Sequence, residues 1–210
     1  MGIYEKALEL NEAWAQERER ADPSFFRKLE GGQRPEFLFI GCSDSRVPAN
    51  EIMGLAPGDV FVHRNIANLV PNSDTNVQAV IEYAIEYLEV RHVIVCGHTE
   101  CGGIKAAMRP TDMGVLNGWL RNITDVYRLH FDELTAIGDE AARYLRLIEL
   151  NAEEQCINVF KSAAFQRKQA VNREPEVHAW VYNVGTGRIV DRQLDLKRLV
   201  SKYKSILRLR

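Results

Sequence analysis

The chain reads HVIVCGH at residues 92–98, an apolar run that ends in a glycine and a histidine. Before it, residues 75–89 carry apolar side chains at helical spacing, and residues 60–63 form another short apolar run after a turn. We therefore expect a strand, a helix and a further strand, which together make a parallel crossover unit.

Another apolar run, FLFI at residues 37–40, is typical of a strand buried in a parallel sheet. Farther along, residues 114–167 have a helical pattern, and residues 176–184 form a strand that turns back at the glycines of 185–187. The sequence predicts an α/β fold with a central, mainly parallel sheet flanked by helices, an antiparallel edge strand and an amino-terminal helical arm over about residues 1–30.

At 210 residues the chain has the length of one domain, and no repeat or linker divides it, so we expect a single domain over residues 1–210. Its 27 basic and 29 acidic side chains nearly balance, which provides no basic surface for nucleic acid or for an anionic membrane. The amino terminus lacks an apolar signal core, and no apolar run reaches the roughly 18–20 residues of a membrane span. These features predict a cytoplasmic protein, in which the four cysteines serve as thiols or metal ligands rather than as disulfides.

Three candidate metal ligands follow the predicted strands. Cys42 comes after the strand at 37–40, and His98 and Cys101 come after the strand at 92–96. Open α/β sheets place their sites at such strand ends. Two thiolates and one imidazole suit zinc, so we expect one zinc ion per chain.

The residues after Cys42 leave two interpretations of this site open. Asp44 can complete a closed site with four protein ligands, which is the structural kind. Alternatively, it turns toward Arg46, whose planar guanidinium can hold a carboxylate bidentately, and leaves the fourth position to water. We favour the second interpretation, with Asp44 as an exchangeable fourth ligand. Gly102, at a predicted helix start, offers a backbone N–H where anions are stabilised.

The other cysteines and histidines have less specific explanations. Cys96 lies inside an apolar strand and Cys156 on a helical face, where a thiol behaves as a small hydrophobic group. Four histidines have no partner at metal-ligand spacing and are expected in hydrogen-bonded or surface roles: His63, His92, His130 and His178.

Residues 42–47 (CSDSRV) and 97–103 (GHTECGG) resemble the signature motifs of the β-class carbonic anhydrases. Residues 58–68 and 178–182 also resemble that family, and the four blocks stand in the family's order over most of the chain. The resemblance implies an enzyme in which zinc-bound hydroxide converts carbon dioxide reversibly to bicarbonate and a proton.

The resemblance also implies roles for further residues and an assembly. It implies that Asp44 and Arg46 are the catalytic pair. It also implies that two chains form a homodimer in which the amino-terminal helix reaches over the partner, and that dimers often associate into homotetramers. Bacterial members with an aspartate-gated zinc are regulated by bicarbonate in a second pocket, to which Phe39, Arg64 and Tyr182 correspond. Because Phe39 stands where tryptophan is usual, we expect a weaker bicarbonate effect.

Two other functions are compatible with the same residues. The first is a zinc hydrolase of carbonyl sulfide or carbon disulfide, whose motifs at the metal would hardly differ. The second is a non-catalytic zinc protein with Asp44 as a permanent fourth ligand. Turnover of the different gases and of carbon dioxide at alkaline pH would distinguish them.

Overall fold

The structure is a computed structural model that describes residues 2–171 and 174–208. The chain divides after Arg34 into two compact units. Within the described ranges no helix is long and apolar enough to cross a membrane.

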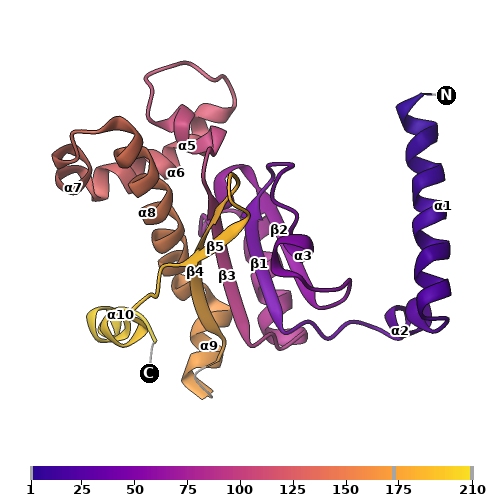
Figure 1. Cartoon of the computed structure of the whole chain (residues 1–210). Helices are drawn as coiled ribbons and strands as arrows, with labels where there is room; N and C mark the ends of the chain where they lie inside the picture. The colour runs from indigo at the N-terminus through magenta and orange to yellow at the C-terminus, as the bar shows by residue number, and fades with distance from the viewer. Residues whose placement is uncertain (1, 172–173, 209–210) are drawn as a thin grey trace. The chain divides into compact units, whose positions relative to one another are not determined.

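The first unit is a pair of helices, α1 (Ile3–Ala21) and α2 (Phe25–Glu30), drawn in indigo in Figure 1. No residue of α1 is buried. The ring of Trp14 lies 5.7 Å from the ring of Phe26, which holds the two helices together. The predicted amino-terminal helix is therefore present, and most of its apolar side chains are exposed.

The second unit is built on a five-stranded sheet (Figure 1). Its spatial order is β2-β1-β3-β4-β5, and every neighbouring pair is parallel except β4 and β5. The predicted mainly parallel sheet with an antiparallel edge strand is confirmed. In chain order the strands are β1 (Phe37–Cys42), β2 (Val60–Asn65), β3 (His92–His98), β4 (Glu176–Asn183) and β5 (Arg188–Asp191).

One face of the sheet carries the largest apolar core. Leu38, Val95 and Ala179 point into it from three strands and are fully buried. The segments that cover this face are α4 (Thr75–Glu82) with its π-helical continuation η2 (Tyr83–Tyr87), α8 (Glu140–Lys161) and α9 (Ala163–Val171). The helix expected to reach residue 89 ends at Tyr87, because Glu89 adopts a left-handed backbone conformation with φ 53°.

The opposite face carries a smaller cluster around Phe39, Ile94 and Cys96, packed against α3 (Ala49–Met53). Three helices, α6 (Leu116–Leu129), α7 (Phe131–Ala136) and α8, fill most of the predicted helical stretch, with breaks at His130 and near Gly138. The remaining helices are η1 (Ile66–Asn68), α5 (Gly102–Ala107) and α10 (Leu196–Tyr203).

The register of the central strands decides where the site forms. β1 and β3 are direct neighbours with Gly41 opposite Cys96, so their carboxyl ends lie at the same edge of the sheet. β1 ends at Cys42 and β3 at His98. Because both strands are buried, the side chains at these ends have little freedom to move.

Candidate metal centre

Three sulfur and nitrogen donors converge at this edge of the sheet. Cys42 ends β1, His98 ends β3 and Cys101 caps the amino end of α5. Their ligand atoms all lie within 4.8 Å of one another, and the two Sγ atoms are 4.0 Å apart. Sulfurs at two corners of a zinc tetrahedron with bonds of about 2.3 Å are about 3.8 Å apart. The three predicted ligands therefore have the spacing that a zinc ion requires.

The imidazole of His98 is oriented for a metal ligand. Its Nδ1 lies 2.8 Å from the Thr99 carbonyl oxygen, so Nδ1–H donates and Nε2 carries the lone pair. This Nε2 is buried and has no hydrogen-bond partner among the described residues. A buried nitrogen without a partner costs about 1–3 kcal/mol, which a bound cation would recover.

The two thiols form a coupled pair that favours a divalent cation. A hydrogen bond from Cys101 lowers the pKa of Cys42, whereas that bond, burial and the Cys42 thiolate raise the pKa of Cys101. The second proton therefore leaves readily only when a positive charge lies between the sulfurs. The donor set is the one that zinc prefers, and the buried Nε2 of His98 faces it, so the residues present fit a zinc ion.

Asp44 is held away from the three donors by Arg46. Arg46 donates from Nε to Asp44 Oδ1 at 2.9 Å and from Nη2 to Oδ2 at 2.7 Å, and its backbone N–H donates to Oδ1 at 3.0 Å. These bonds hold the pKa of Asp44 well below its usual range. Oδ2 lies 3.9 Å from His98 Nε2, so the ionised carboxylate borders the site.

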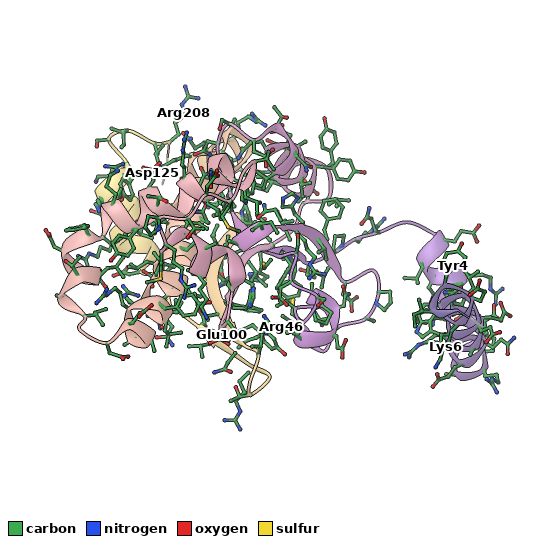
Figure 2. The ribbon with its side chains drawn as sticks, turned by 90° about the horizontal axis from the view of Figure 1, so that it is seen from above. Tyr4, Lys6, Arg46, Glu100, Asp125 and Arg208 are labelled. Carbon is green, nitrogen blue, oxygen red and sulfur yellow. The ribbon has the colours of Figure 1, made fainter. Side chains whose placement is uncertain are left out.

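Arg46 also connects the two loops that carry the ligands. Its Nη2 donates to the Glu100 carbonyl oxygen at 3.1 Å, and Figure 2 shows Arg46 and Glu100 side by side. Glu100 has a positive φ of 57°, which turns the chain between His98 and Cys101. A single guanidinium thus sets both the direction of Asp44 and the position of the second loop.

Arg64 holds the backbone of the first loop. Its Nε donates to the Cys42 carbonyl oxygen at 2.8 Å and its Nη2 to the carbonyl oxygen of Asp44. Phe39 is buried and Tyr182 is half-buried, both in the cluster on the opposite face of the sheet from the main core. Of the three residues expected in a bicarbonate pocket, Arg64 is thus bonded directly to the loop that carries Cys42 and Asp44.

The turn at η1 is a part of the site that the sequence did not reveal. The N–H of Ala67 lies 3.4 Å from Cys42 Sγ, although Ala67 has a left-handed φ of 66°. A buried amide network on α8 holds this turn, because Asn151 Nδ2 donates to the Ala67 carbonyl oxygen at 3.0 Å and Gln155 Oε1 accepts from the Val70 N–H at 2.8 Å. Buried amides at helical spacing on an otherwise apolar face, Asn151 and Gln155, were the available sequence signal.

The loop of Cys101 is fixed by two further contacts. Tyr144 on α8 donates from its hydroxyl to the Cys101 carbonyl oxygen at 2.9 Å. A side chain at Gly103 would place its Cβ 2.9 Å from Ile66 Cγ2 and 3.2 Å from Ala67 Cβ, so α5 packs closely on η1. Gly102 has open space around it, and its backbone opens α5 as the sequence predicted.

The sequence that carries this site is similar to known proteins. The sequence model of the carbonic anhydrase family matches residues 37–189. A carbonic anhydrase of Emericella nidulans is 52% identical over 206 residues, which cover 98% of this chain and 90% of that protein.

Solved structures give the same result for the fold. One of two tetrameric β-carbonic anhydrases of Sordaria macrospora aligns with a TM-score of 0.86 and 44% identity, covering 91% of this chain and 97% of that one. The β-carbonic anhydrase CafA of Aspergillus fumigatus aligns with a TM-score of 0.90 and 36% identity, covering 97% of this chain and 98% of its own.

Proposed function

The chain belongs to the β-class carbonic anhydrase family, whose enzymes hydrate carbon dioxide reversibly to bicarbonate, and we propose that Cys42, His98 and Cys101 hold its one zinc ion. The observation that carries this proposal is the buried Nε2 of His98, which has no hydrogen-bond partner in the described chain and faces two thiols. When bound, zinc supplies the Lewis acidity that makes a water molecule nucleophilic near neutral pH.

Asp44 and Arg46 orient the reacting water in this proposal. Both oxygens of Asp44 are engaged by Arg46, which supports leaving the fourth position to water with Asp44 as an exchangeable ligand. Because its pKa is lowered, Asp44 stays ionised and accepts a hydrogen bond at Oδ2 rather than storing a proton. The backbone N–H of Gly102, at the open start of α5, is proposed as a donor to the bicarbonate anion.

Bicarbonate regulation is proposed to act through Phe39, Arg64 and Tyr182, as in the bacterial subgroup. The link that supports it is Arg64, since its guanidinium donates to the carbonyls of Cys42 and Asp44. An anion that draws Arg64 away would loosen the loop that carries Asp44. With Phe39 in place of an indole donor we expect weak inhibition. Sigmoidal dependence of the rate on bicarbonate that survives Arg64→Ala would contradict this role.

The two units are proposed to work as one domain whose first 30 or so residues are a dimerisation arm. The exposed apolar side chains of α1, including Leu8 and Leu10 at 60% and 59% exposure, support a surface that a second chain covers. Tetrameric relatives support a homodimer or homotetramer, and sedimentation at micromolar concentration would distinguish these from a monomer. A cytoplasmic location is proposed because all four cysteines are free and buried.

The proposed function is tested by stopped-flow hydration of carbon dioxide on protein of measured zinc content. We expect one zinc ion per chain in the wild type and in Asp44→Asn, with hydration at least about 100-fold slower in the variant because the negative charge and one of the two acceptor oxygens are lost. Cys101→Ser should lose both zinc and activity. The matched control is Asp125→Asn, which removes an exposed aspartate paired with Arg128 at 3.2 Å.

Three outcomes would contradict the proposal. Full activity in Asp44→Asn would exclude the catalytic role of that carboxylate. Stoichiometric zinc without hydration in the wild type would indicate a non-catalytic zinc protein. Faster turnover of carbonyl sulfide or carbon disulfide than of carbon dioxide would indicate the hydrolase alternative.

A further inference from the structure

A second cluster of metal-ligand atoms lies at the amino ends of β3 and β4. It consists of His92, the first residue of β3, with Glu176 and His178 near the start of β4. His92 and His98 stand at opposite ends of the seven-residue strand β3, roughly 20 Å apart at about 3.3 Å per residue. The cluster is therefore separate from the centre formed by Cys42, His98 and Cys101.

The three ligand atoms have the spacing of a metal site. His92 Nδ1 lies 3.1 Å from His178 Nε2, and Glu176 Oε2 lies 3.8 Å from each of these nitrogens. The point equidistant from three atoms so spaced lies about 2.1 Å from each, which is the length of a zinc bond to imidazole or carboxylate, about 2.0–2.2 Å. The carboxylate is placed symmetrically between the two rings.

The positions of the two rings are set by the sheet. The His92 ring stacks on Phe37 of β1 with centroids 5.3 Å apart, and its other neighbour is the His178 ring at 5.2 Å. Backbone hydrogen bonds from His92 N to Glu36 O and from Glu176 N to Arg91 O fix the starts of both strands. A site whose ligands are already positioned loses little entropy when an ion binds.

The chemistry of the cluster matches first-row transition ions. Two imidazoles with one carboxylate suit zinc, nickel and copper better than magnesium or calcium, which prefer oxygen ligands. Glu176 is 62% exposed, so an ion can enter from solvent and water can complete its coordination. The proton shared between the two rings would leave to solvent on binding.

We propose that His92, Glu176 and His178 form a second cation site that binds a divalent first-row transition ion, zinc or nickel, and joins the amino ends of β3 and β4. An exposed site with three nitrogen and oxygen ligands binds more weakly than the buried centre with two thiolates. The full chain should therefore take up one ion tightly and a second at higher free concentration.

The proposal is tested by equilibrium dialysis of the full chain, already loaded with one zinc ion, against increasing free Zn²⁺, with total zinc measured per chain. The wild type should rise from one to two ions. His178→Ala should stay at one, and Glu176→Gln should bind the second ion at least about 10-fold more weakly, because partners outside the ligand shell alone change affinity about 10–100-fold. Ni²⁺ added to the zinc-loaded chain should give the same order of affinities.

The matched control is His130→Ala. His130 has 24% of its side chain exposed, against 26% for His178, and lies near the carboxylates of Glu133 and Glu154. The His130→Ala variant should still bind the second ion. Because Glu176 is on the surface, its variant keeps the test decisive even where a histidine variant fails to fold. A wild type that saturates at one ion, or equal second-ion affinity in the wild type and Glu176→Gln, would overturn the proposal. Carbon dioxide hydration at one zinc per chain, measured in parallel, reports separately on the catalytic centre.

Discussion

Replacing Gln155 by methionine removes the acceptor that holds the turn beside Cys42 without changing the side-chain length. Gln155 is 1% exposed, and its Oε1 accepts the Val70 N–H at 2.8 Å while Val70 is itself fully buried. The substitution leaves that N–H without a partner and out of reach of water. An unsatisfied buried donor costs about 1–3 kcal/mol, so we take about 2 kcal/mol as the loss of stability.

This loss corresponds to a measurable change in the melting temperature. For a chain of about 150–250 residues each kcal/mol lowers Tm by about 2–4 °C, which gives about 4–8 °C for Gln155→Met. The assay is thermal unfolding followed by circular dichroism at fixed protein and zinc concentrations, because both affect the apparent Tm.

A matched control uses the same substitution at a half-buried glutamine whose hydrogen bonds lie at the surface. Gln166 donates to the Lys161 carbonyl oxygen at 3.0 Å and accepts from the Arg208 N–H at 3.1 Å. Both bonds are exposed, so water can replace them, and Gln166→Met should stay within about 0.5 kcal/mol of the wild type. A Tm of Gln155→Met within about 1–2 °C of the wild-type Tm would refute the reasoning that the Val70 N–H depends on this acceptor. A change of that size is all that is expected of the Gln166→Met control.

Three further predictions concern the sheet and the metal centre. Gly41→Ala should lower the free energy of unfolding, measured with denaturant, by about 1–3 kcal/mol, because the new Cβ would lie 2.3 Å from Cε1 of the buried Phe39 ring. The control is Gly118→Ala, whose Cβ would have no atom within 4 Å, and it should be neutral or stabilising. Tyr144→Phe should release zinc to a chelator about 10–100-fold more readily, measured with a colorimetric zinc indicator, because the Cys101 carbonyl loses its hydroxyl donor. Removing zinc should lower Tm by about 8–16 °C, which corresponds to about 4 kcal/mol of stability. Adding Zn²⁺, but not Mg²⁺, should restore the Tm. An unchanged Tm in the metal-free chain would contradict a contribution of the metal centre to stability.

Local sequence determined much of the fold. The apolar runs at residues 37–40 and 92–96 predicted buried parallel strands because only a strand covered on both faces tolerates a continuous apolar pattern. The apolar runs also show where each strand ends, so Cys42 and His98 could be named as ligands at the strand ends, and Cys101 followed from its position three residues after His98. The neighbourhood of Asp44 and Arg46 also followed from their separation by one residue, which a bidentate ion pair readily spans.

The tertiary structure decided which distant groups meet. Asn151 and Gln155 lie on a helix more than 80 residues after the turn that they hold, and their sequence pattern indicates burial but not the partner. Arg64 was expected to serve an anion pocket, whereas the register of β1 and β2 also brings its guanidinium to the carbonyls of the first ligand loop.

The clearest contrast is between the two candidate metal clusters. His98 and Cys101 are three residues apart, so one loop brings them together and the spacing is visible in the sequence. His92 and His178 are 86 residues apart, and the sequence predicted hydrogen-bonded or surface roles for each of them separately. They meet because β3 and β4 are parallel neighbours whose register places His178 opposite Ile94, one pleat along from His92 on the same face of the sheet. Strand pairing between distant segments depends on how the whole core packs, and that information is not present in either strand alone.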